Sequence, residues 1–334
     1  MTTAEHNAAQ LSVVIPLYNE SENVEPMLEE LFGVLGGLPA SSEVICVDDG
    51  STDATFAKLR EAAARHRELR VLRFPANYGQ TAALSAGFHA ARGGVVVTID
   101  GDLQNDPADI PRLLEVLEGG ADIASGWRRS RKDGFLLRTL PSRIANRLIS
   151  RITGVHLHDY GCTLKAYRSE LLGRFELYGQ MHRFIPALGA WAGGRVEEIE
   201  VNHRPRRRGS SKYGIGRTIT VLLDLVTVKF LMSYGSHPIR VFGMAGVVSW
   251  LLAIGSLAAV VFMKWRLEPP VDMTGNPLLY LAMLGAVVGV QFLLMGMLAE
   301  MQMRTYHEAQ DKRPYVVSET IDRSPALGAA EESG

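Results

Sequence analysis

The stretch Gly94-Val-Val-Val-Thr-Ile-Asp-Gly-Asp-Leu-Gln104 decides the fold of this chain. Its apolar, β-branched first part predicts a buried strand. Asp100 and Asp102 follow where that strand ends, with a glycine between them. Two carboxylates this close repel each other unless a cation lies between them, and hard oxygen ligands suit Mg²⁺ or Mn²⁺. We therefore predict Asp100 and Asp102 as metal ligands, with Gln104 as a further ligand or orienting group. A solvated turn is the alternative for this motif alone.

A pattern of strand followed by helix repeats along the first part of the chain. Strands are expected at residues 11–16, 44–47, 70–73 and 94–99, and helices at 19–36, from a cap at Ser51 or Thr52, and at 81–92. This alternation predicts an α/β fold with a mostly parallel, Rossmann-like sheet. Ligands of such sheets bind beyond the carboxyl ends of the strands. The loops containing residues 18–20, 48–49 and 100–102 are therefore expected at one edge.

Asp48 and Asp49 follow a different strand from Asp100, at the same predicted edge. One of these carboxylates can accept hydrogen bonds from the base or ribose of a nucleotide. The alternative is a purely structural turn, because Asp-Gly-Ser is common in turns. The whole-chain net charge of −1 identifies no partner, and the two cysteines show no metal-ligand spacing.

Several motifs occur together and in order. They are Val13-Val-Ile-Pro-Leu-Tyr-Asn-Glu20, Val47-Asp-Asp-Gly-Ser-Thr-Asp53, Asn77-Tyr-Gly-Gln80, Asp100-Gly-Asp-Leu-Gln-Asn-Asp-Pro107, Gly126-Trp-Arg128, His158-Asp-Tyr-Gly-Cys-Thr-Leu-Lys165 and Arg208-Gly-Ser-Ser-Lys-Tyr213. This set resembles the inverting GT-A glycosyltransferases of family 2. Within that family the chain looks like the polyprenyl-phosphate glycosyltransferases, including the dolichyl-phosphate mannose synthases.

The resemblance implies a role for each matching position. The nucleotide pocket would be lined by Pro16, Tyr18, Glu20 and Asp49, with Asp48 and Asp100 beside them. Asp102 and Gln104 would hold the metal, and Arg128 would approach the sugar or phosphate. The lipid phosphate would be bound by Arg206 and Lys212, joined by Arg138 and Ser142 on a weaker local match. Asp159 is our candidate for orienting the sugar, with a turn role before Gly161 as its alternative.

Two long uncharged runs near the C-terminus predict a transmembrane hairpin. The expected division is a disordered N-terminus at 1–10, a GT-A catalytic domain at 11–203, a basic segment and interfacial helix at 204–238, transmembrane helices at 239–264 and 278–299, an extracytoplasmic loop at 265–277, and a cytosolic tail at 300–334, disordered after about Ser318. Residues 135–152 and 215–234 combine apolar and basic residues, as interfacial amphipathic helices do. A core-facing helix is the alternative for each.

Basic residues are concentrated before the first predicted span and after the second. The positive-inside rule then places the catalytic domain and both termini in the cytosol, at the inner or plasma membrane. The N-terminus is polar and shows no secretory signal. The basic run at 204–213 adjoins a span and has no aromatic platform, so nucleic acid is not an expected partner.

We predict a metal-dependent enzyme that transfers a sugar from a nucleotide sugar to a polyprenyl phosphate, with Mg²⁺ or Mn²⁺ as cofactor. UDP-glucose is the favoured donor, because Asp159-Tyr-Gly-Cys162 resembles the bacterial glucosyl and aminoarabinosyl branch. A GDP-mannose-dependent mannose synthase is the alternative donor class. A processive polysaccharide synthase lacks support without a Gln-x-x-Arg-Trp motif, and an inactive membrane scaffold is disfavoured by the intact Asp100 and Asp102. The resemblance also implies a homo-oligomer, such as a tetramer.

Overall fold

A computed structural model describes residues 11–129, 146, 149–151, 153–175, 177, 181–205, 239–266, 272–308 and 318–322. The chain forms two compact units. The first contains residues 1–228 together with 313–334, and the second contains residues 229–312. Residues 318–322, the described part of the C-terminal segment, belong to the first unit, and the predicted boundary at residue 203 stays a prediction.

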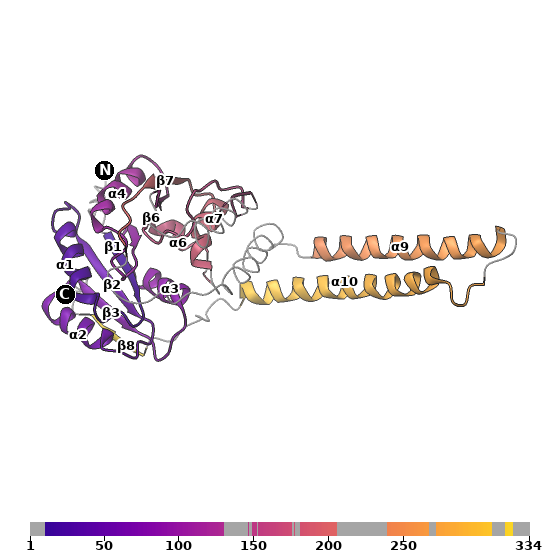
Figure 1. Ribbon diagram of the computed structural model, residues 1–334, viewed down its shortest axis with the longest axis horizontal. Helices are drawn as coiled ribbons and strands as arrows, with labels where there is room; N and C mark the ends of the chain where they lie inside the picture. Colours follow the sequence, from indigo (N-terminus) through magenta and orange to yellow (C-terminus); the bar gives the residue numbers. More distant parts are fainter. Residues whose placement is uncertain are drawn as a thin grey trace, which may run out of the picture. The chain divides into compact units, whose positions relative to one another are not determined.

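The first unit is built on an eight-stranded mixed sheet with the order β7-β5-β6-β4-β1-β2-β3-β8 (Figure 1). The strands are β1 (Leu11–Leu17), β2 (Ser42–Asp48), β3 (Leu69–Arg73), β4 (Val95–Thr98), β5 (Ile123–Trp127), β6 (Lys165–Arg168), β7 (Val196–Glu200) and β8 (Glu319–Ile321). Strands β1 to β4 pair in parallel with one another, as does β5 with β7. Strands β6 and β8 run antiparallel to their neighbours. The predicted α/β sheet is thus confirmed.

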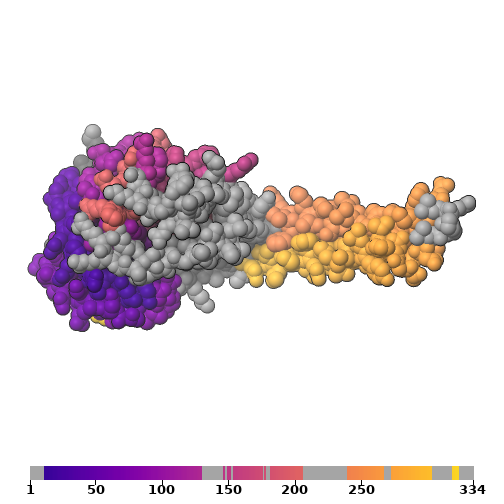
Figure 2. All heavy atoms as spheres, viewed as in Figure 1, coloured from indigo at the N-terminus to yellow at the C-terminus, as the bar shows by residue number. Residues whose placement is uncertain are grey.

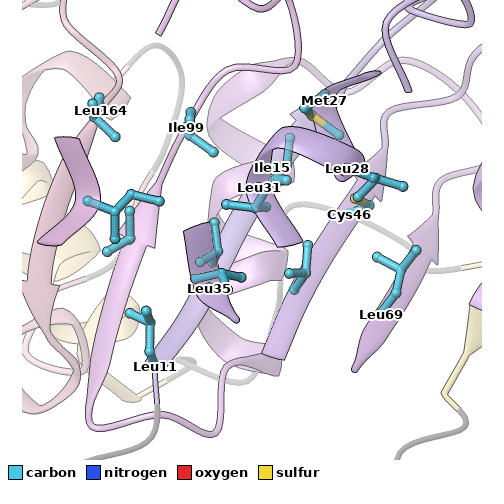
Figure 3. Packing of buried hydrophobic residues seen from close by; sticks show 14 of the residues in the cluster. Leu11, Ile15, Met27, Leu28, Leu31, Leu35, Cys46, Leu69, Ile99 and Leu164 are labelled. Atoms are coloured by element: carbon cyan, nitrogen blue, oxygen red, sulfur yellow. The ribbon is translucent and has the colours of Figure 1, made fainter. Parts of the chain in front are cut away.

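Among the described residues of this unit, the helices are α1 (Val24–Leu35), α2 (Thr55–Arg65), α3 (Gln80–Ala90), α4 (Ile110–Glu118), α6 (Ser169–Leu172) and α7 (Ile185–Trp191), with the short 3₁₀ turns η1 (Pro107–Asp109) and η3 (Met181–Phe184). Apolar residues at helical spacing place one face of α1 on the sheet, and Met27, Leu28 and Leu31 of that face are buried. Figure 3 shows these side chains beside Ile15 and Cys46. Each fully buried leucine or isoleucine contributes about 1.5–3 kcal/mol of hydrophobic stabilisation.

Helix α2 begins later than the sequence predicts. Its cap residue is Ala54, and neither Ser51 nor Thr52 caps it. Both side chains instead form hydrogen bonds with Asn19, since Ser51 Oγ accepts the amide N–H of Asn19 at 2.9 Å and Thr52 Oγ1 donates to Asn19 Oδ1 at 3.3 Å. The expected cap was wrong because tertiary partners outcompete a local capping bond.

The second unit contains two long helices, α9 (Ile239–Arg266) and α10 (Pro277–Glu308), and both are long and apolar enough to cross a membrane. Most of their large apolar side chains are exposed, including Met244, Leu251 and Leu284. Figure 2 shows the two helices in contact along their length. The contact is close at Gly289, where a Cβ would lie 2.3 Å from the Trp250 ring. Small residues permit such packing between membrane helices.

The chain returns to the sheet after α10. Residues 319–321 form β8, which pairs with β3 at the sheet edge (Figure 1). Ser318 supports the pairing, since its N–H and Oγ donate to the carbonyl of Arg73 at 2.8 and 3.0 Å. Beyond the strand, Asp322 forms ion pairs with Arg70 and Arg92 at 3.2 and 2.7 Å. The prediction of a disordered tail after Ser318 is wrong for these residues. The small polar residues at 318–322 give no sign in the sequence that Asp322 pairs with Arg70, which lies far away along the chain.

Candidate active site

The carboxyl ends of β1, β2 and β4 lie at one edge of the sheet because these strands are parallel. The loops that follow β1 and β2 are joined by hydrogen bonds. Asn19 exchanges bonds with Ser51 and Thr52, and the amide N–H of Glu20 donates to Thr55 Oγ1 at 2.9 Å. The positive φ of Asn19 (51°) is one that asparagine tolerates. The predicted gathering of Tyr18, Glu20, Asp49 and Asp100 at one edge follows directly from this topology, with Pro16 inside β1 behind them.

The carboxylate of Asp49 organises the turn at residues 77–79. Its two oxygens accept the backbone N–H groups of Tyr78 at 2.7 Å and Gly79 at 2.9 Å. Burial raises the pKa of Asp49 to about 6, although the two amide bonds oppose the shift. A carboxylate in this setting keeps lone pairs for a further donor, so contact with a nucleotide base is chemically open to it.

Asp48 lies deeper than Asp49, and its carboxylate contacts other residues of the chain. Its side chain is fully buried, accepts the N–H of Ser51 at 3.1 Å and lies 3.6 Å from Arg73 Nε. Burial raises the pKa of Asp48, and Ser51 and Arg73 act against that shift. This arrangement favours a role in holding the loop. A nucleotide contact by Asp48 stays a prediction.

Asp100 and Asp102 flank Gly101 at the end of β4, as the sequence predicts. Gln80 Nε2 donates to Asp100 Oδ1 at 2.9 Å, and the N–H of Gln104 donates to Asp102 Oδ1 at 3.1 Å. Burial and the charge of Asp102 together raise the pKa of Asp100 to about 6. Leu103 lies between Asp102 and Gln104, is buried and has a φ of +61°. For a leucine this conformation costs about 1–2 kcal/mol.

The residues here fit a divalent cation. Mutual repulsion between Asp100 and Asp102 is relieved by positive charge, and carboxylate and amide oxygens are the ligands that Mg²⁺ and Mn²⁺ prefer. Among the described residues no group of three or more His, Cys, Asp and Glu could hold a metal ion. Besides the predicted ligand Gln104, a cation bound by these two carboxylates would take its other ligands from substrate oxygens and water, as Mg²⁺ commonly does with phosphates.

Arg128 and Asp159 form a bidentate ion pair. Arg128 Nε and Nη2 donate to the two carboxylate oxygens of Asp159 at 2.7 and 3.1 Å. Burial disfavours the charged guanidinium, yet the charge of Asp159 outweighs it and raises the pKa of Arg128. Asp159 is itself buried, and its N–H donates to Glu198 at 3.0 Å. Asp159 thus orients Arg128; its predicted role on the sugar would act through that guanidinium.

The sequence analysis missed two buried polar residues at this edge. Lys165 begins β6, and its ammonium donates to the carbonyls of Tyr160 and Cys162, which fixes the loop that carries Asp159. Burial lowers the pKa of Lys165. The available signal was the position of Lys165 at the end of the motif His158-Asp-Tyr-Gly-Cys-Thr-Leu-Lys165. His182 Nδ1 lies 2.8 Å from Thr81 Oγ1, next to Gln80, and no local pattern links residues so far apart in sequence.

The four residues predicted to bind the lipid phosphate, Arg138, Ser142, Arg206 and Lys212, lie outside the described residues. Both predicted interfacial helices, at 135–152 and 215–234, also fall largely or wholly outside them. The acceptor side of the site therefore stays a prediction from the sequence.

Residues 12–175 match the family model described as glycosyl transferase family 2. Across 94% of this chain and 93% of the relative, 42% of residues are identical to a dodecaprenyl-phosphate galacturonate synthase of Rhizobium johnstonii. The chain belongs to glycosyltransferase family 2. An undecaprenyl-phosphate 4-deoxy-4-formamido-L-arabinose transferase of Aeromonas hydrophila is 35% identical over 97% of both chains. These family 2 relatives confirm the resemblance drawn from the motifs.

A solved structure has a similar fold. The glucosyl-3-phosphoglycerate synthase of Mycobacterium tuberculosis, crystallised with Mn²⁺ and UDP-glucose, superposes with a TM-score of 0.52 at 21% identity, covering 66% of this chain and 79% of that one. At this identity the likeness concerns the fold alone, and it supports the GT-A-like architecture of the family 2 catalytic domain.

Proposed function

We propose that this glycosyltransferase passes a sugar from a nucleotide diphosphate to a polyprenyl phosphate, on the cytosolic face of a membrane. One observation carries the proposal. The relatives that use dodecaprenyl and undecaprenyl phosphate match nearly the whole chain, including the two apolar helices as well as the catalytic domain. A soluble acceptor would not require that second unit.

The donor sugar has two leading candidates. The motif Asp159-Tyr-Gly-Cys162 favours UDP-glucose by its resemblance to the bacterial glucosyl branch. The 42% identity with a galacturonate synthase favours a nucleotide-linked galacturonate. GDP-mannose is a third donor to be tested. Each candidate places a diphosphate at the Asp100–Gln104 loop.

The residues of the site divide the chemistry between them. Asp100, Asp102 and Gln104 would hold Mg²⁺ or Mn²⁺, which when bound neutralises the charge of the departing nucleotide diphosphate. Asp49 would accept a hydrogen bond from the base. Arg128, held by Asp159, would offset the repulsion between the two anionic substrates.

The acceptor needs no deprotonation. A lipid phosphate is already ionised at neutral pH, whereas a hydroxyl acceptor would need a general base. Attack from the face opposite the leaving diphosphate inverts the anomeric carbon. Positioning of the two substrates then supplies much of the rate. In this scheme Arg206 and Lys212, with Arg138 and Ser142, bind the acceptor phosphate.

The return of the chain to its sheet supports a two-span topology. Both ends of the α9–α10 hairpin continue into the same folded unit, because β8 pairs with β3. A folded sheet occupies one side of a membrane, so the intervening segment must cross an even number of times. Arg240 in the first turn of α9 and Lys312 after α10 favour the cytosol for that side. We retain the division at residues 204–238, 239–264, 265–277 and 278–299, and the homo-oligomer, as parts of this proposal.

A donor panel tests the function. Radiolabelled UDP-glucose, UDP-galacturonate and GDP-mannose are each incubated with the full chain, undecaprenyl phosphate and Mn²⁺, and label is extracted into organic solvent. We expect one donor to label the lipid, EDTA to abolish the transfer, and Asp102→Asn to lower it at least about 100-fold. If no donor labels the lipid, or if Asp102→Asn transfers at the wild-type rate, the proposal fails.

A further inference from the structure

The loop that carries the proposed metal ligands contains a strained residue. Leu103 lies between Asp102 and Gln104 with a φ of +61°, and its side chain is buried. Residues other than glycine keep such a conformation only where surrounding contacts impose it. The hydrogen bond from Gln104 N to Asp102 Oδ1 is internal to the loop. The loop therefore needs support from another part of the chain.

That support comes from the extended segment at residues 202–204. The N–H of Arg204 donates to the carbonyl of Gln104 at 2.8 Å. His203 and Asn105 form an antiparallel β-bridge. One residue earlier, Asn202 N donates to the buried carboxylate of Asp109 at 2.6 Å. The segment thus runs alongside the metal loop and fixes the residues directly after Leu103.

The side chain of Arg204 fastens the segment in place. Its Nη1 lies 2.5 Å from Glu30 Oε2 on α1, and its Nη2 lies 2.8 Å from Asp106 Oδ1 on the metal loop. The Arg204 side chain is 29% exposed, and that of Asp106 is 17% exposed. One guanidinium therefore bridges a helix of the core and the loop that follows the metal ligands.

We propose that Arg204 is a positioning residue, which holds the Asp102–Gln104 turn in its strained, metal-binding form. It acts through backbone pairing and through its bridge from Glu30 to Asp106. The inference rests on the proposed function, because that function assigns the metal to this turn. Arg206, predicted to bind the acceptor phosphate, follows Arg204 two residues later in the sequence.

The test is Mn²⁺ affinity in the presence of UDP, measured on the full chain in detergent by the electron paramagnetic resonance signal of free Mn²⁺. We expect Arg204→Met to weaken Mn²⁺ binding about tenfold and Arg204→Lys to restore part of it, since a lysine can pair with one carboxylate. Glu30→Gln, which leaves the metal loop itself unchanged, should weaken binding about threefold. Arg195→Met is the matched control, because it removes an exposed pair with Glu197 on β7 and should bind Mn²⁺ as the wild type does.

The outcomes separate this inference from the proposed function. Mn²⁺ affinities of Arg204→Met and Glu30→Gln within twofold of wild type overturn the positioning role. Equal weakening in Arg195→Met also overturns it, because the effect would then be non-specific. A wild-type protein that binds Mn²⁺ with UDP but labels no lipid overturns the proposed function alone. Glu30→Gln keeps the test decisive if Arg204→Met fails to fold.

Discussion

Asp49 and Gly50 show how single residues shape the loops at the carboxyl edge of the sheet. The carboxylate of Asp49 holds the 77–79 turn through two amide bonds. Gly50 follows with a φ of +69°, and a Cβ there would lie 2.3 Å from the backbone carbon of Ala76. The approach of the loop at residues 49–50 to the loop at residues 76–79 thus depends on the carboxylate of Asp49 and on the absence of a side chain at Gly50.

We expect nucleoside affinity to decrease as the pH is lowered through the titration of Asp49, whose pKa is raised to about 6. In the proposed function the ionised carboxylate of Asp49 accepts a hydrogen bond from the base, so we expect uridine affinity to be about tenfold lower at pH 5 than at pH 7. Uridine is the probe because it carries no phosphate that titrates in this range. Saturation-transfer NMR measures the affinity, and Asp49→Asn should give a flat profile. A wild-type affinity independent of pH would contradict the assignment.

The same shift affects stability in the opposite sense. Because the folded pKa of Asp49 lies above the unfolded value, its contribution to the free energy of unfolding is present below about pH 4 and is lost as the pH rises through about 6. The stability of the wild type relative to Asp49→Asn should therefore decrease over this interval, which urea unfolding at several pH values measures.

Gly50→Ala should destabilise the fold by more than about 2 kcal/mol, since it adds a positive-φ penalty to a clash with backbone. The matched control is Gly33→Ala on α1, where a Cβ meets nothing within 4 Å. That change should stabilise the helix by about 0.5–1 kcal/mol. Urea midpoints by circular dichroism compare the two. Equal and small effects would mean that the loop can move away from Ala76.

At the scale of elements, the sequence was sufficient to predict the strands and helices that depend on local patterns of apolar residues. The strands at 11–17, 42–48, 69–73 and 95–98, the parallel sheet and both long apolar helices were all predictable from periodicity and apolar runs. The gathering of Asp49 and Asp100 followed from strand direction. Long-range pairings left no such trace: the bonds of Thr81 to His182 and the return of β8 join residues whose local sequences are unremarkable.

The ion pairs of Asp322 should make β8 a measurable part of sheet stability. Asp322 forms an ion pair with Arg70, whose side chain is only 9% exposed. When the negative charge of Asp322 is removed, Arg70 keeps its ion pair with Glu43 but loses the one with residue 322. We expect Asp322→Asn to lower the free energy of unfolding by about 1–2 kcal/mol. Glu200→Gln removes an exposed pair with Arg129 and should cost less than about 0.5 kcal/mol. Equal urea midpoints for the two variants would show that β8 contributes little.

At the scale of the whole molecule, cysteine labelling tests the two-span topology. Both native cysteines, Cys46 and Cys162, are buried, so they should stay silent to a membrane-impermeant maleimide. Thr274→Cys, exposed between α9 and α10, should react in intact spheroplasts. Glu61→Cys, exposed on α2 of the sheet unit, should react only after the membrane is permeabilised. Labelling of both positions from the same side would contradict the hairpin.

The strand β8 also dictates an order of events during synthesis. Ser318 bonds to a residue made 245 positions earlier, and the ribosome reaches it only after both apolar helices have been translated. Until then the outer edge of β3 is unpaired and Arg70 lacks one of its carboxylates. Contacts of such long sequence separation form late. Closure of the sheet is thus a final step, and a chain truncated within α9 or α10 lacks the strand β8 that completes it.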